Sequence, residues 1–225
     1  METFVVRVWV PDRPGALGQV ASRIGAVRGD VVGIDILERG AGRAIDELVV
    51  QLPDAGLVSL LLAEIDQVDG VDVEDARPAP PELADPRLDA LETAALLVGA
   101  ASFHELLDCL VAHARRDFGS EWAVVVDLDE RTLLASHGAP PPPAWLVAFV
   151  AGSESSAAVS AGECGPDDVA WAPLGTSRLA LLLGRQGRPF RSRERHQLAA
   201  LCKITQYVVT TLGVDRPLSV PAGQI

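Results

Sequence analysis

A corner that contains proline and glycine, near the amino terminus, constrains the fold more than any other feature of this sequence. The segment 3–10 before it is rich in β-branched and aromatic residues, which favours a strand. The residues after it place apolar side chains at helical spacing, at Leu17, Val20, Ile24 and Val27. Residues 11–18, Pro-Asp-Arg-Pro-Gly-Ala-Leu-Gly, therefore join a strand to a helix.

The residues of this corner suit the capture of an anion. Pro14 has a fixed φ and no N–H, which fits the first position of a helix. Gly15 has no side chain, so a ligand can approach the backbone closely. Backbone N–H groups at the start of a helix carry partial positive charge and favour a carboxylate. The alternative is that the corner is only a tight turn.

The next elements complete an α+β domain within the first 76 residues. Residues 31–38 and 43–52 are predicted strands joined by a turn at 39–42. A second helix, with Asp54 as its N-cap, carries apolar residues at Leu57, Leu61, Ile65 and Val68. A short strand at 71–76 follows. The order, strand-helix-strand-strand-helix-strand, is ferredoxin-like, with two helices on one face of an antiparallel sheet.

This order, with Asp-Arg-Pro-Gly-Ala-Leu at 12–17 in its first corner, resembles the ACT domain. The resemblance implies an amino acid effector held between paired domains, by the loop after one protomer's first strand and the start of its neighbour's second strand. The implied ligand-binding residues are Asp12, Arg13, Pro14, Gly15, Ala16, Leu17, Val31 and Val32.

The resemblance also suggests roles for three of these residues. Asp12 would accept a hydrogen bond from an ammonium group, and the N–H groups of Ala16 and Leu17 would donate to a carboxylate. Many amino-acid-binding members have Asn near the start of the second strand, where this chain has Val-Val-Gly at 31–33. The identity of the ligand is therefore open.

Prolines at 78, 80 and 81 predict an extended linker at 77–85, between an ACT domain at 1–76 and a second domain at 86–214 with a tail at 215–225. Two helices open the second domain, the second of them with a Ser102–Glu105 capping box. Predicted strands at 122–128, 132–136, 169–174 and 179–183, a short helix at 145–150, a loop at 151–166 and a long final helix follow.

This second set of elements resembles a GAF domain over residues 88–213: an antiparallel sheet flanked by helices. The resemblance implies a small-molecule pocket between the sheet and a cover of short helices and loops. By position, the possible pocket residues are Ser136, His137, Trp145, Phe149 and Trp171. An aromatic lining suits a planar or apolar ligand, but the same side chains could simply fill a core.

Charge and cysteine content narrow the function. A net charge of -12 argues against nucleic acid and anionic membranes as partners, and the absence of a leader-like start or a long apolar run favours a cytoplasmic protein. Cys109, Cys164 and Cys202 lie far apart, with neither disulfide nor metal-ligand spacing. The four histidines share no spacing either, so no metal site, no cofactor and no catalytic residue is expected.

The sequence thus predicts a non-catalytic regulatory protein that senses a small metabolite, an amino acid above all, and signals by contact with an unknown protein partner. A homodimer is the expected assembly. One alternative is a GAF-based sensor in signalling or transcription control, in which the ACT domain only dimerises. A second is a thiol enzyme, similar to methionine sulfoxide reductases, that uses Cys164; the acidic residues around that thiol disfavour its thiolate.

Overall fold

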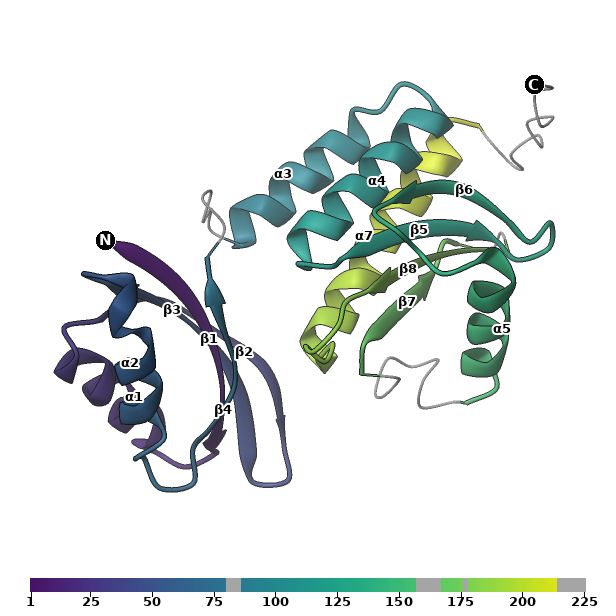
Figure 1. Cartoon of the computed structure of the whole chain (residues 1–225). Coiled ribbons are helices and arrows are strands. Elements are labelled where there is room, and N and C mark those ends of the chain that lie inside the picture. The colour runs from purple at the N-terminus through teal and green to yellow at the C-terminus, as the bar shows by residue number, and fades with distance from the viewer. Residues whose placement is uncertain (80–85, 157–166, 176–177, 214–225) are drawn as a thin grey trace. The chain divides into compact units, whose positions relative to one another are not determined.

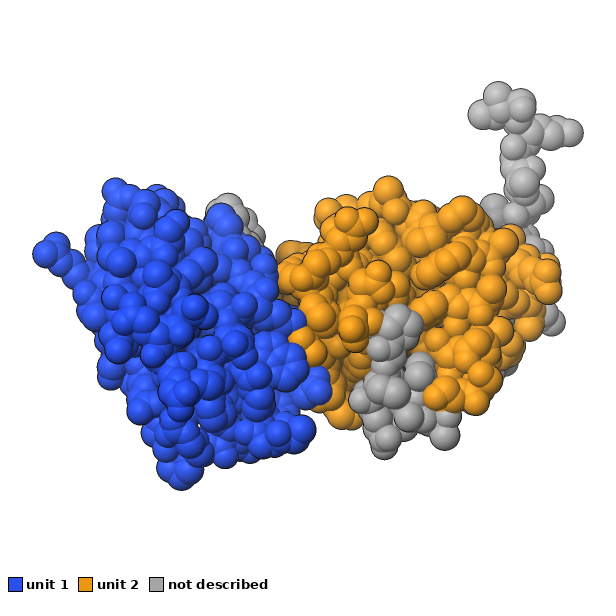
Figure 2. Space-filling model, turned by 60° about the horizontal axis from the view of Figure 1, so that its bottom comes forward, with its two compact units in different colours: residues 1–83 blue, residues 84–225 orange. Residues whose placement is uncertain are grey.

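The chain divides into two compact units, Met1–Leu83 and Ala84–Ile225 (Figure 2). The structure, a computed structural model, describes residues 1–79, 86–156, 167–175 and 178–213. Most of the predicted linker, at 80–85, and the predicted tail at 215–225 lie outside these residues. Each unit has a hydrophobic core of its own.

Unit 1 consists of β1 (Glu2–Pro11), α1 (Ala16–Ala26), β2 (Asp30–Gly40), β3 (Arg43–Leu52), the short 3-10 helix η1 (Ala55–Leu57), α2 (Val58–Ile65) and β4 (Asp72–Pro78). Its sheet has the strand order β2-β3-β1-β4, and every neighbouring pair is antiparallel. Both α-helices lie on one face of the sheet (Figure 1). This is the ferredoxin-like topology, which confirms the predicted fold class of this half.

The period-two pattern of β1 and β3 builds the core of unit 1. Val6 of β1 lies opposite Leu48 of β3, and Phe4 lies opposite Val50, so these alternate residues share the face that the helices cover. From the helices, the same cluster contains Ala16, Val20, Ile24, Leu61 and Ile65. Burying each large apolar side chain stabilises the fold by about 1.5–3 kcal/mol. The apolar face of each helix therefore fixes how it lies on the sheet.

The end of β4 and the start of α2 differ from the prediction. β4 continues to Pro78, two residues into the predicted linker, because Arg77 binds the carboxylates of Asp75 (2.7 Å) and Glu47 (3.2 Å). Asp54 does cap a helix, but the helix is η1: its Oδ1 accepts from the N–H of Gly56 at 2.6 Å, and α2 begins only at Val58.

Unit 2 consists of α3 (Pro86–Val98), α4 (Phe103–Asp117), β5 (Trp122–Asp127), β6 (Thr132–His137), α5 (Pro143–Glu154), β7 (Val169–Pro173), β8 (Leu179–Gly184) and α7 (Ser192–Thr211). Its antiparallel sheet has the order β6-β5-β8-β7. Helices α3, α4 and α7 lie on one side of the sheet and α5 lies on the other (Figure 1). The prediction of an antiparallel sheet flanked by helices is confirmed.

Strand β8 explains how one sheet supports two cores. Leu181 and Leu183 belong to the cluster shared with α4 and α7, whereas Leu182 belongs to the cluster shared with α5. All six residues of β8 are buried, which accounts for its continuous apolar run in the sequence. The helix α5 is longer than predicted: residues 151–154, expected in a loop, are helical, and the buried side chain of Ser153 lies there. Residues 157–166 of that loop lie outside the described residues.

Candidate functional site

The turn between β1 and α1 is exposed and held in place by the β2–β3 hairpin. The N–H of Asp12 donates to the carbonyl oxygen of Gly42 at 2.9 Å. Arg13 and Pro14 are exposed, and the Arg13 guanidinium donates to Oε1 of Gln19 at 3.4 Å. Pro14 precedes the helix, whereas the sequence predicts it at the first helical position. The cap residue is Gly15.

Gly15 has a left-handed backbone that an L side chain rarely adopts. Its φ is 86°, and no described atom lies within 4 Å of the position that a Cβ would take there. Gly15 supplies no side chain to cap the helix. The turn therefore requires glycine for its conformation, although the place of a Cβ on Gly15 is itself open.

The first N–H groups of α1 fall into two groups. Ala16 donates to the carbonyl oxygen of Arg13 at 3.3 Å, and Gln19 donates to that of Gly15 at 3.1 Å. The N–H groups of Gly15, Leu17 and Gly18 have no acceptor in the described part of the chain. A set of unpaired amides at the positive end of an eleven-residue helix can bind a carboxylate or another anion.

This donor set differs from the predicted one in two residues. The amide of Ala16, expected to bind the ligand, is already bonded within the turn, and the Ala16 side chain is buried. Gly18, which the sequence reasoning did not name, contributes an amide instead. Gly18 is exposed and lies in the first turn of α1. Because the first N–H groups of a helix have no acceptor within it, the predicted helix start alone could have identified this amide.

Val31 and Val32 lie far from this turn in the same protomer. Val31 lies opposite Val50, which lies opposite Phe4 at the start of β1, whereas the turn follows Pro11 at the end of β1. The two valines are therefore at the opposite end of the sheet. Because β2 is an edge strand, they could meet a β1–α1 turn only if that turn belonged to a second copy.

A carboxylate that the sequence reasoning missed lies on the helix side of β3. Asp46 lies opposite Val8 of β1, and its side chain is only 4% exposed. Its Oδ1 is buried without a hydrogen-bond donor among the described residues. Burial raises the pKa of Asp46; the positive charge of Arg39 lowers it, and the negative charge of Asp12 raises it further. The signal in the sequence was an aspartate at an inward position between Ala44 and Leu48.

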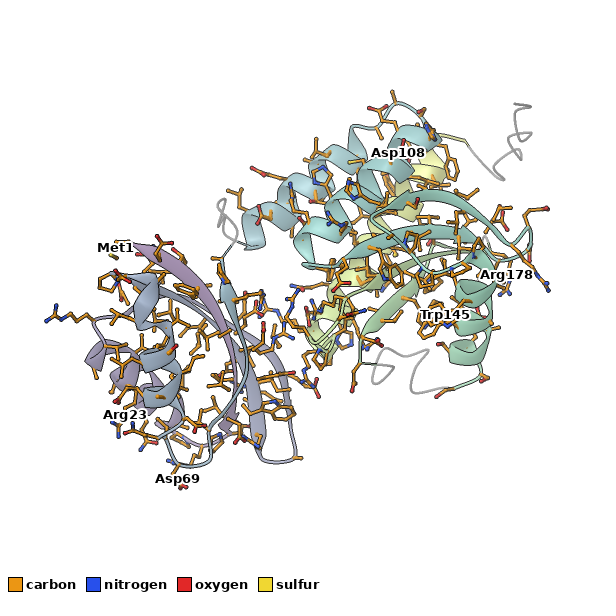
Figure 3. The ribbon with its side chains drawn as sticks, in the orientation of Figure 1. Met1, Arg23, Asp69, Asp108, Trp145 and Arg178 are labelled. Carbon is orange, nitrogen blue, oxygen red and sulfur yellow. The ribbon has the colours of Figure 1, made fainter. Side chains whose placement is uncertain are left out.

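The predicted pocket residues of unit 2 lie on both sides of the sheet. Trp145 lies on α5 (Figure 3). Its ring stacks on that of Phe149, of the same helix, with the ring centroids 5.3 Å apart. Phe149 and Trp171 pack against the α5-side core. Ser136 is exposed opposite Val124, on that same side. His137 is the next residue of β6, so it lies on the opposite face.

The α5 side of the sheet is filled by aliphatic side chains. Leu146 and Val150 of α5 are completely buried against Val124, Val126 and Leu182. Trp145 is 45% exposed and lies outside this packing. Four of the five predicted residues therefore share the α5 side of the sheet, but the structure does not gather them into one lining. Ser136 on β6 and Trp171 on β7 lie at opposite edges of the sheet, with β5 and β8 between them.

One of the arginines that precede α7 has a structural role. Arg185 is 3% exposed and donates to the carbonyl oxygens of Phe118 (2.6 Å) and Pro189 (2.9 Å). It also pairs with Glu194 at 2.8 Å and lies over the Phe190 ring. Arg185 therefore fixes the Pro-Phe turn to the end of β8.

The cysteines and histidines of the described ranges show neither a lowered thiol pKa nor a cluster of metal ligands. Burial raises the pKa of the Cys109 thiol and that of the Cys202 thiol. Cys164 lies outside the described residues. Within those ranges, no three His, Cys, Asp or Glu side chains gather as metal ligands would. None of the described helices has both the length and the apolar character needed to cross a bilayer.

Comparison with protein-family models and with curated proteins finds no match. Among solved structures, the chain is similar to the ACT domain of the GTP pyrophosphokinase of Chlorobium tepidum, with 15% identity and a TM-score of 0.29 over 35% of this chain and 97% of that one. It is also similar to the GAF domain of an Acinetobacter phosphoenolpyruvate-protein phosphotransferase, with 16% identity and a TM-score of 0.42 over 61% of this chain and 100% of that one.

A third solved structure resembles most of the chain. The chromophore-binding domain of an unusual bacteriophytochrome from R. palustris aligns with 96% of this chain and 95% of its own, at 11% identity and a TM-score of 0.38. These likenesses concern the fold alone.

Proposed function

We propose that this protein is a non-catalytic regulator that binds a small metabolite carrying a carboxylate, above all an amino acid, at the β1–α1 turn. The observation that carries the proposal is the set of unpaired N–H groups of Gly15, Leu17 and Gly18, at a turn where the Cβ position of Gly15 is open. Hydrogen bonds from amides to a charged carboxylate contribute about 1.5–3 kcal/mol each, more than those to a neutral acceptor. An anionic ligand therefore fits this turn better than a neutral one.

The proposed assembly is a homodimer in which a second copy completes the site. The edge strand β2 is eleven residues long and exposes Val32 (46%) and Ile34. A long edge strand with exposed apolar residues is suited to pairing with another strand. Antiparallel pairing of two β2 strands would bring the start of one, with Val31 and Val32, toward the far end of the other.

Regulation then follows from linkage. A ligand that contacts two copies binds the paired state more tightly than the separate chains, and so stabilises the pair by the difference in affinity. Helix α3 exposes Leu88, Leu91, Leu96 and Val98, and α7 exposes Tyr207. These apolar side chains support a further contact with a second copy or with a protein partner, through which the signal would pass.

The remaining parts of the proposal rest on composition. The net charge of -12 supports a protein partner rather than nucleic acid or an anionic membrane. Three widely spaced cysteines without disulfide spacing support a cytoplasmic location.

Isothermal titration with each common L-amino acid tests the proposal. We expect heat of binding from the wild-type protein for at least one amino acid, and its loss in Gly15→Trp, whose side chain would occupy the space in front of the amides. Gly25→Ala is the matched control, because Gly25 lies on the same helix with no described atom near a Cβ. Equal heats from wild type and Gly15→Trp would reject the site.

Two other outcomes would favour the alternatives. Loss of binding in Trp145→Ala but not in Gly15→Trp would point to a sensor in unit 2. Turnover of methionine sulfoxide that Cys164→Ser abolishes would point to a thiol enzyme.

A further inference from the structure

His113 lies on the face of α4 that packs against α3 (Figure 1). Arg116 and Asp117 follow it by three and four residues, so the three side chains share one face of the helix. Thr93 of α3, which is 1% exposed, contacts the other two. Its hydroxyl donates to Oδ2 of Asp117 at 2.6 Å and accepts from Arg116 at 3.3 Å. His113 therefore belongs to the seam between α3 and α4.

The rest of this seam is apolar. Leu97 lies one turn after Thr93 on α3, and Leu110 lies one turn before His113 on α4. Both leucines are completely buried in the core cluster that these helices share with the sheet of unit 2. His113 is thus the titratable residue of α4 that stands between an apolar core and a polar cluster.

The Nδ1 atom of His113 is buried and has no hydrogen-bond partner in the described part of the chain, although the residue as a whole is partly exposed. A neutral imidazole can keep its proton on Nε2 and leave Nδ1 as an unused acceptor. A protonated imidazole carries an N–H group on both nitrogens, so it would bury a donor without an acceptor. The seam therefore accommodates the neutral ring better than the charged one.

The charges on α4 do not reverse this preference. Burial lowers the pKa of His113 from its ordinary value of 6.5, the charge of Arg116 lowers it further, and the charge of Asp117 raises it. The carboxylate of Asp117 is already engaged by Thr93 and by Nε of Arg116 at 2.8 Å. Cys109, one turn before His113, is kept as a neutral thiol because burial raises its pKa.

The other elements packed against α4 bring few charges to this face. On α3, Asp89 lies one turn before Thr93. At the C-terminal end of α4, Arg185 donates to the carbonyl oxygen of Phe118 and pairs with Glu194 of α7. The residues of β5 and β6 in the shared core cluster are apolar: Ala123, Val125 and Ala135.

We propose that the seam between α3 and α4 is a proton-sensitive joint, which holds α3 in place while His113 is neutral and loosens α3 when His113 takes up a proton. Helix α3 is the element that moves, because it is the first helix of unit 2 and packs against α4 and α7 on one side only. Its outer side exposes Leu88, Leu91 and Leu96. This device gives the protein a response to acidification that does not depend on a ligand at the β1–α1 turn.

The direction of the response follows from linkage. When the seam opens, His113 regains the ordinary pKa of an exposed histidine, so the open state binds protons more readily than the closed one. Docking of α3 is therefore strongest above that ordinary pKa and weakens as pH falls from it toward the lower pKa of the closed seam. Because one proton is involved, the opening equilibrium changes by no more than about tenfold per pH unit.

Hydrogen exchange of the full chain, corrected for the intrinsic exchange rate at each pH, measures this opening. Between about pH 7.5 and about pH 5, the protection of α3 should fall by at least about threefold while β5 and β8 keep theirs. His113→Gln, which cannot take up the proton, should lose this pH dependence. His104→Gln is the matched control, because His104 lies on the same helix with its side chain 82% exposed, and it should behave as the wild type.

Three outcomes of this experiment would overturn the inference. The first is a protection of wild-type α3 that does not change with pH. The second is an equal fall in His113→Gln, since another group would then be responsible. The third is an equal fall in β5 and β8, since unit 2 would then unfold as a whole.

A measurement on the wild type keeps the inference testable if His113→Gln fails to fold. Two-dimensional ¹H–¹⁵N NMR of the imidazole rings should show neutral His113 with its proton on Nε2, and a titration below the ordinary value of 6.5. Titration of His113 at or above that value would show that the closed seam accepts the charged ring, which contradicts the proposed joint.

Discussion

The β1–α1 turn of unit 1 and the α5 side of unit 2 were both predicted to bind small molecules, and they differ in what they leave unsatisfied. At the turn, three backbone amides have no partner among the described residues. The buried Oδ1 of Asp46, on β3 of the same unit, has none either. At the α5 side, Leu146 and Val150 are fully buried against the sheet, and Phe149 packs beside them, with the exposed Trp145 stacked on its ring.

Both places were predicted as ligand sites from a resemblance to a family. The difference between them shows how a packed core can be distinguished from a binding site. Apolar side chains that contact one another have already gained their burial free energy, so a guest must displace them. Unpaired polar groups gain most when a ligand supplies their partners. By this criterion the turn is the better candidate.

The largest loss of stability is expected from a cavity in the core between α5 and the sheet of unit 2. Leu146→Ala should lower the free energy of unfolding by about 2–5 kcal/mol, because the residue is fully buried and leaves a cavity. Urea unfolding measures it, and Trp145→Ala, at a 45% exposed position, should cost far less. If Leu146→Ala were as stable as the wild type, the core between α5 and the sheet would not be closely packed. The contrast with the β1–α1 turn would then fail.

A smaller loss is expected at the turn. Gly15→Val should destabilise the protein by about 1–2 kcal/mol, because a β-branched residue must adopt the positive φ of Gly15. It should also abolish amino acid binding. Gly25→Ala, in the helical region of the same helix, should instead be neutral or stabilising by up to about 1 kcal/mol. Thermal unfolding distinguishes the two, and equal effects would contradict the described turn geometry.

The two neighbouring carboxylates of β3 should respond to pH in opposite ways. Because the folded pKa of Asp46 is raised above 3.8, the stability that its proton provides is present below the unfolded pKa and is lost as pH rises through the folded pKa. Because the folded pKa of Glu47 is lowered below 4.5, its contribution is present above the unfolded value and is lost as pH falls through the folded pKa.

Unfolding of Asp46→Asn and Glu47→Gln across acidic and neutral pH checks these signs. The advantage of Asp46→Asn over the wild type should grow with rising pH, and the deficit of Glu47→Gln should shrink with falling pH. If the difference in unfolding free energy from the wild type changed with pH in the same way for both variants, the pKa values of Asp46 and Glu47 would be shifted in the same direction, contrary to the account.

The smallest effect on the monomer is expected at the edge of unit 1. Val32→Lys places a charge on an exposed position of β2, so the stability of one copy should change by no more than about 0.5 kcal/mol. Self-association should weaken, because edge lysines oppose strand pairing. Sedimentation equilibrium measures this, and an unchanged assembly would exclude the β2 edge as the interface.

The architecture followed from the sequence because its signals are local. Alternation in residues 3–10 and 43–52 and the helical spacing from Leu17 onward each specify one element and its buried face, and their order specifies the ferredoxin-like sheet. The α5 boundary was wrong because Gly152 and Ser153 favour a loop by composition, whereas burial of Ser153 keeps them helical.

The details of the sites depend on tertiary contacts that no local pattern records. The strand β6 continues to His137, which puts that side chain on the face opposite Ser136. Arg185 looks like a surface residue until the turn at 187–190 folds over it and Glu194 pairs with it. The lack of a partner for Asp46 is visible only once its neighbours on β1 and β2 are known.

The amide signals of Gly15, Leu17 and Gly18 provide the most direct test of the central claim. They would be followed by two-dimensional ¹H–¹⁵N NMR of the full chain during titration with the amino acid that binds most tightly. A carboxylate that accepts hydrogen bonds from these groups should shift their proton resonances downfield and leave the Trp145 indole signal unchanged. Saturable shifts confined to Trp145 and its neighbours on α5, with the three amides unmoved, would contradict it.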